Sequence, residues 1–437
     1  MNTFSSTAPT SAAPRAPSGS HAAPAKSLLR HARWADPAVL LGWVLFTTIF
    51  ANSFAAVRYL IVAYFAAGMV IFARDTLLVY ARAWPTLILP VMCIISTIWA
   101  PSANEAIRKG LLLGLTGVIA VYAASRLSAR QIVSVYFLGE TLGALLSAVQ
   151  PNAAYGAWTG IFGQKNYLAL HMFILYTTGL VIAFDRESNV WLRYSTILFI
   201  PLAAGLIFLS KSTTTILLMG ATTAALVGHA LIWEPASRVK HMRTLIVASA
   251  VVFGVTASLL LFGLFQVDVM DTLLRSFGKD STLTGRTFIW DWGRRIMNEN
   301  PWTGVGANGF WRPEIGIANQ ILSHFQYALF TKFSFHNSFI ENGVQFGYPG
   351  YYATMFIAAW GIWNTAQTWL RKQTLANAAF LVFAAMVVIR SNSEVDLATE
   401  LAASTVLLFI GAARREKIAK PPPQATLTPQ VGWRYVR

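Results

Sequence analysis

The stretch FHNSFIENGVQFGYPG, Phe335 to Gly350, marks the point where a long polar loop ends and a strongly apolar segment begins. The residues from 337 to about 363 are apolar and numerous enough to cross a bilayer as a helix. His336 therefore lies at or just before the first turn of a predicted membrane span. A titratable imidazole at the end of a span is placed where it can do chemistry.

The composition of the whole chain agrees with that first span. Of 437 residues, 55% are hydrophobic and only 12% are charged, and the mean hydropathy is +0.51. Soluble domains contain about 25% charged residues. Runs of about 20 apolar residues recur throughout, each long enough to cross a bilayer as a helix. We expect an all-α polytopic membrane protein.

About twelve transmembrane helices are predicted, with one long loop between residues 265 and 336 that contains amphipathic helices. The predicted spans are 38–54, 57–73, 84–100, 107–124, 131–150, 167–184, 193–209, 213–233, 244–265, 337–363, 374–391 and 395–413. Together they form a predicted catalytic domain over 31–413. Residues 1–30 are rich in Ala, Ser, Pro and Thr and are expected to be a disordered cytoplasmic N-terminus, and 414–437 a basic cytoplasmic tail.

The net charge of +16, from 34 Lys and Arg against 18 Asp and Glu, would suggest nucleic acid in a soluble protein. In a membrane protein it indicates cytoplasmic loops and contact with anionic membrane lipids, so no nucleic-acid partner is expected. With both termini cytoplasmic, most of the basic residues outside the long loop fall on inner segments. The long loop is then extracytoplasmic. The turns that carry Lys165 and Lys211 lie on the same outer side, where the positive-inside rule does not explain them.

These two turns have the features of anion sites. GIFGQKNYLAL, Gly160 to Leu170, places Lys165 and Asn166 where a helix begins, and free backbone N–H groups there favour an anion. The alternative is an N-cap at Asn166 with Lys165 reaching the headgroups. FLSKSTTTILL, Phe208 to Leu218, holds Lys211 between hydroxyls and apolar helices. A desolvated cation there is costly and usually functional, although a lysine reaching the headgroups remains the alternative.

The long loop contains a third cation of interest. In LTGRTFIWDWGRRIMNENPWTGVGANGFW, Leu283 to Trp311, apolar residues recur at helical spacing and predict an amphipathic helix that ends at Asn300-Pro301. Arg286, near its start, is expected to face the site, where its guanidinium suits bidentate contact with phosphate. Arg294 and Arg295 are expected on the wet face. The glycines at 304, 306 and 309 resemble a phosphate loop only weakly.

His336 is the candidate general base. The positive end of a helix disfavours the imidazolium form, so we expect a neutral ring, with Asn337 available to orient it. A capping or hydrogen-bonded histidine without proton transfer is the alternative. The other histidines show no ligand spacing and Cys93 is the only cysteine, so no metal and no cofactor are expected. Near the last span, Arg390 and Glu394 are four residues apart and are expected to form a structural ion pair.

The ordered set of motifs resembles the bacterial O-antigen ligase family, within the wider superfamily of O-antigen ligases, polymerases and protein O-oligosaccharyltransferases. The matching residues are Gly163-Gln164-Lys165-Asn166, Ser210-Lys211-Ser212, Arg286, Asn300-Pro301 to Gly309-Phe310, and His336-Asn337 with Gly343, Gly347 and Gly350. Where the family commonly has a second arginine, this sequence has Lys211, which keeps the charge but loses bidentate geometry.

The resemblance implies a metal-independent, inverting glycosyl transfer on the periplasmic face of the bacterial inner membrane. The implied donor is an O-antigen chain on undecaprenyl pyrophosphate, and the implied acceptor is a sugar hydroxyl of lipid A–core oligosaccharide. The resemblance gives catalytic roles to His336, Arg286 and Lys211. Substrate binding is expected of a larger set: Gln164, Lys165, Asn166, Ser210, Ser212 and Asn337.

Three alternatives stay open at this point. A polymerase of the same superfamily would use the same donor and differ in its acceptor. A protein O-oligosaccharyltransferase would transfer the glycan to protein. A transporter of lipid-linked glycan would require charged residues at mid-membrane, whereas the polar motifs of this sequence gather at one face.

Overall fold

The computed structural model describes residues 23–49, 55–150, 152–154, 156–258, 285–328 and 333–415. Its helices are α1 Ala23–Val44, α2 Ala55–Ile71, α3 Ala73–Arg82, α4 Ile88–Ile95, α5 Ala103–Arg126, α6 Ala129–Val149, α7 Lys165–Phe184, α8 Val190–Leu209, α9 Thr213–Gly228, α10 Glu234–Ala236, α11 Met242–Ser258, α13 Arg286–Glu299, α14 Gly316–His324, α15 Ser338–Arg371, α16 Leu375–Arg390 and α17 Ala403–Ala413. Short 3₁₀ or π segments include η5 Gly160–Phe162 and η6 His229–Trp233. Within these residues the only strands are β1 Ala153–Ala154 and β2 Ala157–Trp158, an antiparallel hairpin that pairs Ala153 with Trp158.

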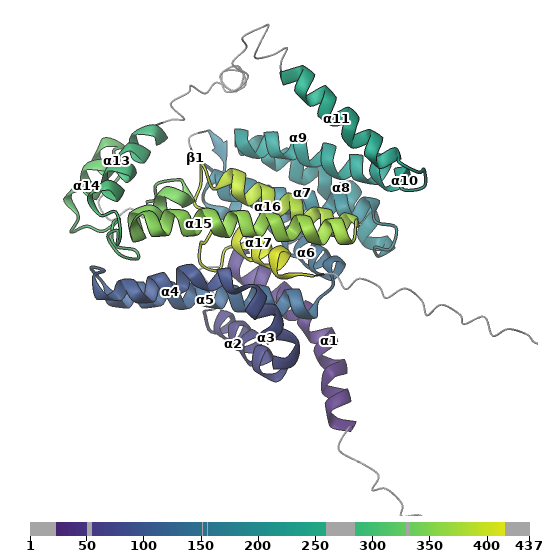
Figure 1. Ribbon diagram of the computed structural model, residues 1–437, viewed down its shortest axis with the longest axis horizontal. Helices are drawn as coiled ribbons and strands as arrows, with labels where there is room; N and C mark the ends of the chain where they lie inside the picture. The colour runs from purple at the N-terminus through teal and green to yellow at the C-terminus, as the bar shows by residue number, and fades with distance from the viewer. Residues whose placement is uncertain are drawn as a thin grey trace, which may run out of the picture.

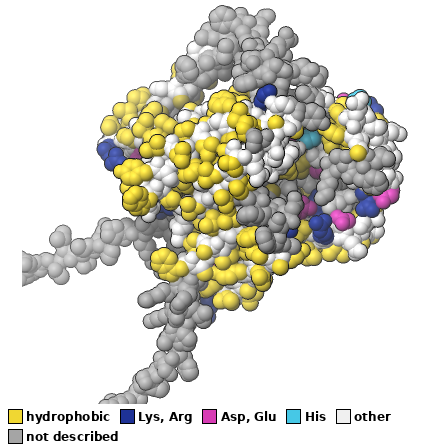
Figure 2. Space-filling model, turned by 180° about the vertical axis from the view of Figure 1, so that it is seen from behind, with side chains coloured by type: hydrophobic (Ala, Val, Ile, Leu, Met, Phe, Trp, Pro, Cys, Tyr) yellow, Lys and Arg dark blue, Asp and Glu magenta, His cyan; other side chains and the backbone are white. Residues whose placement is uncertain are grey.

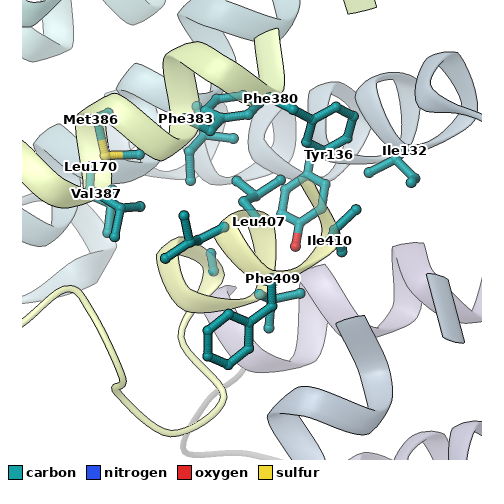
Figure 3. Packing of buried hydrophobic residues seen from close by; sticks show 14 of the residues in the cluster. Ile132, Tyr136, Leu170, Phe380, Phe383, Met386, Val387, Leu407, Phe409 and Ile410 are labelled. Atoms are coloured by element: carbon teal, nitrogen blue, oxygen red, sulfur yellow. The ribbon is translucent and has the colours of Figure 1, made fainter. Parts of the chain in front are cut away.

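The helices α7, α9, α15 and α16 lie side by side, with α13 and α14 at one end and α10 at the other (Figure 1). Helix α7 is the central one, because 83% of its most apolar window is buried in the protein, against 22% for α8. Apolar side chains of α6, α7, α16 and α17 fill the core, as Tyr136, Leu170, Phe383 and Leu407 illustrate (Figure 3). Burying such faces is the main apolar contribution to the fold.

In the described part of the chain, five helices are long and apolar enough to cross a membrane: Ala103–Arg126, Ala129–Val149, Lys165–Phe184, Val190–Leu209 and Thr213–Ala236. A sixth span is possible if α2 and α3, bent by 100° at their junction, count as one. Hydrophobic side chains cover most of the left part of the molecular face in Figure 2, and most of the visible charged side chains lie on its right side. The fold is therefore that of an all-α, multi-pass membrane protein, and the number twelve stays a prediction.

Several predicted boundaries differ from the structure. The sequence predicts a span over 395–413, but α17 begins only at Ala403, because residues 394–402 form a loop in which the Glu394 side chain bonds to Arg286 and the Asp396 side chain bonds to Arg390. Helix α1 begins at Ala23, inside the segment for which disorder is expected, and residues 1–22 lie outside the described part of the chain. The bend between α2 and α3 is not foreseen by the apolar pattern.

The predicted amphipathic helix in the long loop is confirmed as α13, which begins at Arg286 and is capped at Asn300. It buries Ile289, Ile296 and Met297 in a small core shared with Phe335 and the first turns of α15. Helix α14 joins the same core through Ala318 and Ile321. The part of the loop that the structure describes is thus packed onto the end of α15, and residues 265–284 lie outside the described part.

Candidate active site

His336 is held immediately before α15 by the helix cap that follows it. The Asn337 side-chain oxygen accepts hydrogen bonds from the backbone N–H groups of Phe339 at 2.9 Å and Ile340 at 3.1 Å. This is the N-cap contact that satisfies otherwise unpaired donors at a helix start. His336 itself has a backbone φ of +48°, a left-handed conformation that non-glycine residues rarely adopt and that often marks functional sites.

The same segment is fastened to the loop between α16 and α17. The Asn337 side-chain amide donates to the carbonyl of Asn392 at 3.1 Å, and the Ser338 N–H donates to the carbonyl of Ser391 at 2.8 Å. The Ser338 hydroxyl donates to the carbonyl of Glu394 at 3.2 Å. The start of α15 and the end of α16 therefore form one bonded unit, although more than fifty residues separate them in the chain.

Glu394 is the point where the predicted site residues meet. Its Oε1 accepts from Arg286 Nη2 at 2.5 Å and from the Asn166 amide at 2.6 Å, and its Oε2 lies 3.3 Å from His336 Nδ1. Burial alone would raise the pKa of Glu394, but the hydrogen bond with His336 and the charge of Arg286 outweigh it and lower the pKa below its usual value. Glu394 is thus an anion that joins three segments far apart in sequence.

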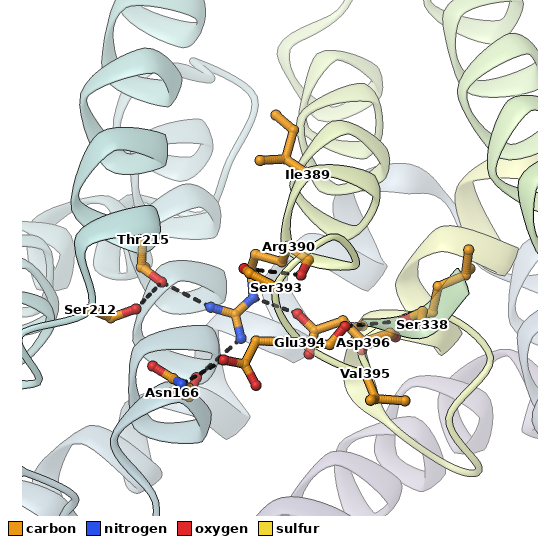
Figure 4. A network of polar contacts seen from close by, with 12 residues as sticks. Asn166, Ser212, Thr215, Ser338, Ile389, Arg390, Ser393, Glu394, Val395 and Asp396 are labelled. Carbon is orange, nitrogen blue, oxygen red and sulfur yellow. Dashed lines mark hydrogen bonds and ion pairs between the residues drawn. The ribbon is translucent and has the colours of Figure 1, made fainter. Parts of the chain in front are cut away.

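Arg390 forms a second, deeper layer of the site. It is 2% exposed, pairs through Nε with Asp396, and donates to Thr215 Oγ1 at 2.9 Å and to the Asn166 carbonyl at 3.2 Å. Figure 4 shows these side chains together with Glu394. The expected pairing of Arg390 with Glu394 is wrong in its partner, because the chain turns after Arg390 and brings Asp396 against the guanidinium instead.

Lys165 and Lys211 lie beside this network without joining it. Lys165 is the first residue of α7, next to Asn166, and Lys211 precedes Ser212, whose hydroxyl contacts Thr215 Oγ1 at 3.0 Å. Within the described residues neither lysine side chain has a hydrogen-bond or ion-pair partner. Lys211 is exposed and has a backbone φ of +52°, so it too occupies a left-handed conformation.

The remaining predicted binding residues are mostly occupied within the protein. Ser210 is fully buried, donates to the carbonyl of Ile207, and accepts from the N–H of Ser212. Ser212 and Asn337 are also buried, with the contacts described above. Gln164 is exposed at the N-cap position of α7 and makes no side-chain capping bond. The hydrogen bonds of Ser210, Ser212 and Asn337 therefore hold the local structure around the site. The side-chain amide of Asn337 makes no hydrogen bond with the imidazole of His336.

The glycine-rich loop after α13 packs on α15 and is not a phosphate cradle. The N–H groups of Val305 and Gly306 donate to carbonyls of Val344 and Gln345, both at 2.9 Å. Helix α15 breaks at Gly347, where φ is +70° and a Cβ would lie 2.4 Å from the Pro301 carbonyl oxygen. The loop therefore packs closely against the kink, and any residue larger than glycine at position 347 would clash with it.

One ionisable pair lies deep between α6 and α7. Glu140 is fully buried, and both of its carboxylate oxygens lie within about 3 Å of His171 Nδ1 (3.0 and 3.1 Å). The His171 ring stacks on Phe162 of η5, with centroids 4.4 Å apart. The pair therefore fixes the turn that leads into Lys165. Across the described residues, no group of three or more His, Cys, Asp or Glu side chains lies close enough together to hold a metal ion.

Sequence reasoning did not identify Glu394 as part of the site. It lies 58 residues after His336 and 108 after Arg286, so no local spacing connects them. Two signals were present. Glu394 is a carboxylate beside a predicted span, where charged groups are rare and costly. Orientation also places it at the same end of the bundle as His336, Lys165 and Lys211.

Two comparisons relate this chain to known proteins. A family model described as O-Antigen ligase matches residues 197–355, which include Lys211, Arg286 and His336. The exopolysaccharide production protein ExoQ of Rhizobium meliloti (strain 1021) is 25% identical over 338 residues, which cover 74% of this chain and 75% of the relative. Both matches support a relationship of this chain to the O-antigen ligase/polymerase superfamily of membrane proteins.

Proposed function

We propose that the protein is an O-antigen ligase. It transfers a glycan from undecaprenyl pyrophosphate to a sugar hydroxyl of lipid A–core oligosaccharide at the periplasmic face of the inner membrane. The observation that carries the proposal is the convergence of Arg286, His336 and Asn166 on Glu394 at one end of the bundle. That arrangement combines a base and fixed cations at one place.

His336 is the general base in this proposal. When Nδ1 carries the ring proton and donates it to Glu394, Nε2 presents a lone pair. The acceptor hydroxyl oxygen attacks the anomeric carbon of the donor, its proton passes to Nε2, and the bond from that carbon to pyrophosphate breaks with the electron pair leaving on pyrophosphate. Attack opposite the leaving group inverts the anomeric centre. Glu394 holds the ring orientation and stabilises the imidazolium that forms, as a carboxylate does behind other catalytic histidines.

The cations at the same end stabilise the leaving group. Arg286 uses one nitrogen on Glu394 and has further N–H donors for a phosphate oxygen. Lys165 and Lys211 have no partner within the described residues and lie on the turns beside the network, so their charge is available to pyrophosphate. Fixed cations that face developing negative charge in a partly dry site are an effective source of rate enhancement.

Polymerisation of an exopolysaccharide is the second candidate. The relative that matches three quarters of the chain is named for exopolysaccharide production, whereas the O-antigen ligase model matches a shorter segment. The two reactions share the donor and the leaving group and differ in the acceptor. An acceptor on lipid A–core makes the enzyme a ligase, and an acceptor at the end of a second lipid-linked chain makes it a polymerase.

The catalytic part of the proposal is tested with purified protein in lipid nanodiscs and a lipid-linked glycan donor. His336→Ala and Arg286→Ala are expected to reduce transfer at least about 100-fold. Arg294→Ala is the matched control, because Arg294 lies on the exposed face of the same helix and pairs with the equally exposed Asp291. Undiminished transfer by the His336 or Arg286 variant would remove that residue from its assigned role.

The choice of acceptor is tested by deleting the gene and analysing cell-envelope glycans. A ligase predicts loss of O-antigen from lipopolysaccharide together with accumulation of polymerised, lipid-linked chains. A polymerase predicts that only single repeat units remain on the lipid carrier. Intact lipopolysaccharide with single repeat units would reject the ligase and support the second candidate.

A further inference from the structure

A large cavity lies at the opposite end of the bundle from the candidate active site, at the end of the molecule where α10 lies in Figure 1. Its volume is about 780 Å³, within the range of sites for small molecules. Four parts of the chain surround it: the start of α6, the turn from α7 to α8, the segment from η6 to α11, and the turn from α15 to α16. The distribution of basic residues predicts this end to be the cytoplasmic one.

The wall of this cavity carries more positive than negative charge. Among the described residues, five arginines and three carboxylates line it: Arg130, Arg186, Arg193, Arg238 and Arg243 against Asp185, Glu187 and Glu234. Two of the carboxylates are bound by one arginine, because Arg130 donates through Nε to Asp185 at 2.5 Å and through Nη1 to Glu187 at 2.6 Å. Arg243 donates to the side chain of Gln373.

The other three arginines have no partner from the protein. In the part of the chain that the structure describes, the side chains of Arg186, Arg193 and Arg238 make no hydrogen bond and no ion pair, and the Nε atom of Arg193 is buried as well. A guanidinium is always charged, has five N–H donors and accepts no hydrogen bond. Three such groups around one cavity indicate a ligand with anionic oxygens, and phosphate matches their fork of donors best.

Positive charge at a cytoplasmic end also has a general cause, because Lys and Arg accumulate on the cytoplasmic loops of membrane proteins. That rule does not require arginines from three separate segments to line a single cavity. Nor does it require Asp185 and Glu187 both to pair with Arg130, which leaves the remaining arginines free. Arg74 and Arg82 of α3 are exposed and are not part of this wall, so they serve as the comparison for charge alone.

The start of α8 places the cavity at the depth of lipid headgroups. Trp191 and Tyr194, which flank Arg193 closely in sequence, are 77% and 63% exposed, and Trp and Tyr are enriched where a membrane meets water. Helix α8 and the helix Thr213–Ala236 both reach the cavity, and only 22% of the most apolar window of each is buried in the protein. The rest of their surface is left for lipid, so a headgroup can enter the cavity from the membrane.

We propose that this cavity binds a phosphate group, with Arg186, Arg193 and Arg238 as its donors. An anionic phospholipid headgroup and a small soluble phosphate ester both carry this group, and the depth of the cavity favours the lipid. The surplus of positive charge favours phosphatidylglycerol over phosphatidylcholine, whose ammonium the arginines would repel. The site is separate from the reaction proposed above, because α7 and α16 each run from one site to the other.

The test measures by native mass spectrometry which lipids stay bound to the full chain in neutral detergent, with phosphatidylglycerol and phosphatidylcholine added in equal amounts. The wild-type protein should retain phosphatidylglycerol at least about tenfold better. Arg186→Gln combined with Arg238→Gln should remove most of this preference. Arg74→Gln combined with Arg82→Gln should keep it, because this control removes the same charge from exposed positions outside the cavity.

A second measurement identifies the source of the phosphate. The melting temperature of the delipidated protein is recorded with glycerol 3-phosphate and, as a neutral control, with glycerol. Stabilisation by glycerol 3-phosphate without any preference among the lipids assigns the site to a soluble phosphate ester, provided that the Arg186 and Arg238 double variant loses it and the control keeps it. A preference for phosphatidylglycerol with the same dependence on the variants assigns the site to the headgroup.

A further variant covers the case in which the Arg186 and Arg238 double variant does not fold. Ser237 is exposed and lines the cavity, and Ser237→Glu would offer the unpaired arginines a carboxylate of the protein, so phosphate binding should fall. Three results would overturn the proposal: an equal loss of binding in both double variants, a preference that survives removal of Arg186 and Arg238, or a wild-type protein with neither lipid preference nor stabilisation by glycerol 3-phosphate.

Discussion

Arg286 and Arg390 differ from Lys165 and Lys211 in one respect that the sequence does not reveal. Both arginines are bonded to carboxylates, Arg286 to Glu394 and Arg390 to Asp396. The two lysines lie on the neighbouring turns without a partner among the described residues. The difference separates cations that are held by a carboxylate of the protein from cations that the proposed mechanism leaves wholly to the substrate. Loss of a paired arginine should affect folding, and for Arg286 also activity, whereas loss of an unpaired lysine should affect activity alone.

The largest effect is expected from Arg390→Met. Removing one partner of a buried ion pair leaves Asp396, itself 4% exposed, without compensation, and typically costs about 3–5 kcal/mol. The melting temperature of the purified protein should fall sharply, and transfer activity should be lost with it. Lys211→Met is the control, for which no shift of the melting temperature is expected. Equal melting temperatures for the two variants would show that the distinction between paired and unpaired cations has no energetic meaning.

A large effect on rate, with a smaller effect on folding, is expected from Glu394→Gln. The amide keeps the size of the side chain but no longer stabilises an imidazolium at His336 or neutralises Arg286. Transfer should fall about 100-fold. Glu299→Gln, at the exposed end of α13, should leave the rate unchanged. A rate within twofold of wild type for Glu394→Gln would reduce Glu394 to a structural role.

A moderate effect is expected from Lys211→Met. Loss of a charge-assisted hydrogen bond to pyrophosphate should raise the KM for the lipid-linked donor about tenfold. Lys211→Arg should retain most of the activity, because it keeps the charge. The measurement is a donor titration at saturating acceptor. An unchanged KM for Lys211→Met would favour the alternative in which Lys211 only reaches the lipid headgroups.

The smallest effect concerns acid stability. Because His336 and Arg286 lower the pKa of Glu394 in the folded state, its ionised form contributes stability above the pKa of an unfolded glutamate, about 4.3. That contribution should be lost as the pH falls through the lowered value. Melting curves between pH 7 and pH 3 should therefore show a steeper acid decline for wild type than for Glu394→Gln. Parallel curves would contradict the assigned contacts of Glu394.

Features with a local cause were predictable from the sequence. The amphipathic spacing from Phe288 to Ile296 and the stop at Asn300-Pro301 are properties of one segment, and α13 has those boundaries within a few residues. The start of α15 at Ser338 follows from the change of polarity after His336. Apolar runs likewise located most of the long helices, because membrane spans depend on composition within about 20 residues.

Features that depend on contacts between distant segments were not predictable in the same way. The late start of α17 arises because Asp396 is held by Arg390 and by the hydroxyls of Ser404 and Thr405, which bond to its backbone carbonyl. The role of Glu394 depends on three elements meeting in space. A single sequence shows which residue types are present, but it does not show which of them contact each other. The i, i+4 spacing therefore pointed to Glu394 as the partner of Arg390, whereas the partner is Asp396.

The break at Gly347 has a consequence for how this enzyme class can diversify. The described residues between Arg286 and the break form one packed block, since α13, the glycine-rich loop and the first turns of α15 pack against or bond to one another before the helix changes direction. That block carries both Arg286 and His336 and lies within the segment matched by the family model. Glu394 lies outside this block and binds both of these side chains. We therefore expect that the block can be exchanged as a unit between relatives that have a carboxylate at the position of Glu394, because His336 and Arg286 would move together.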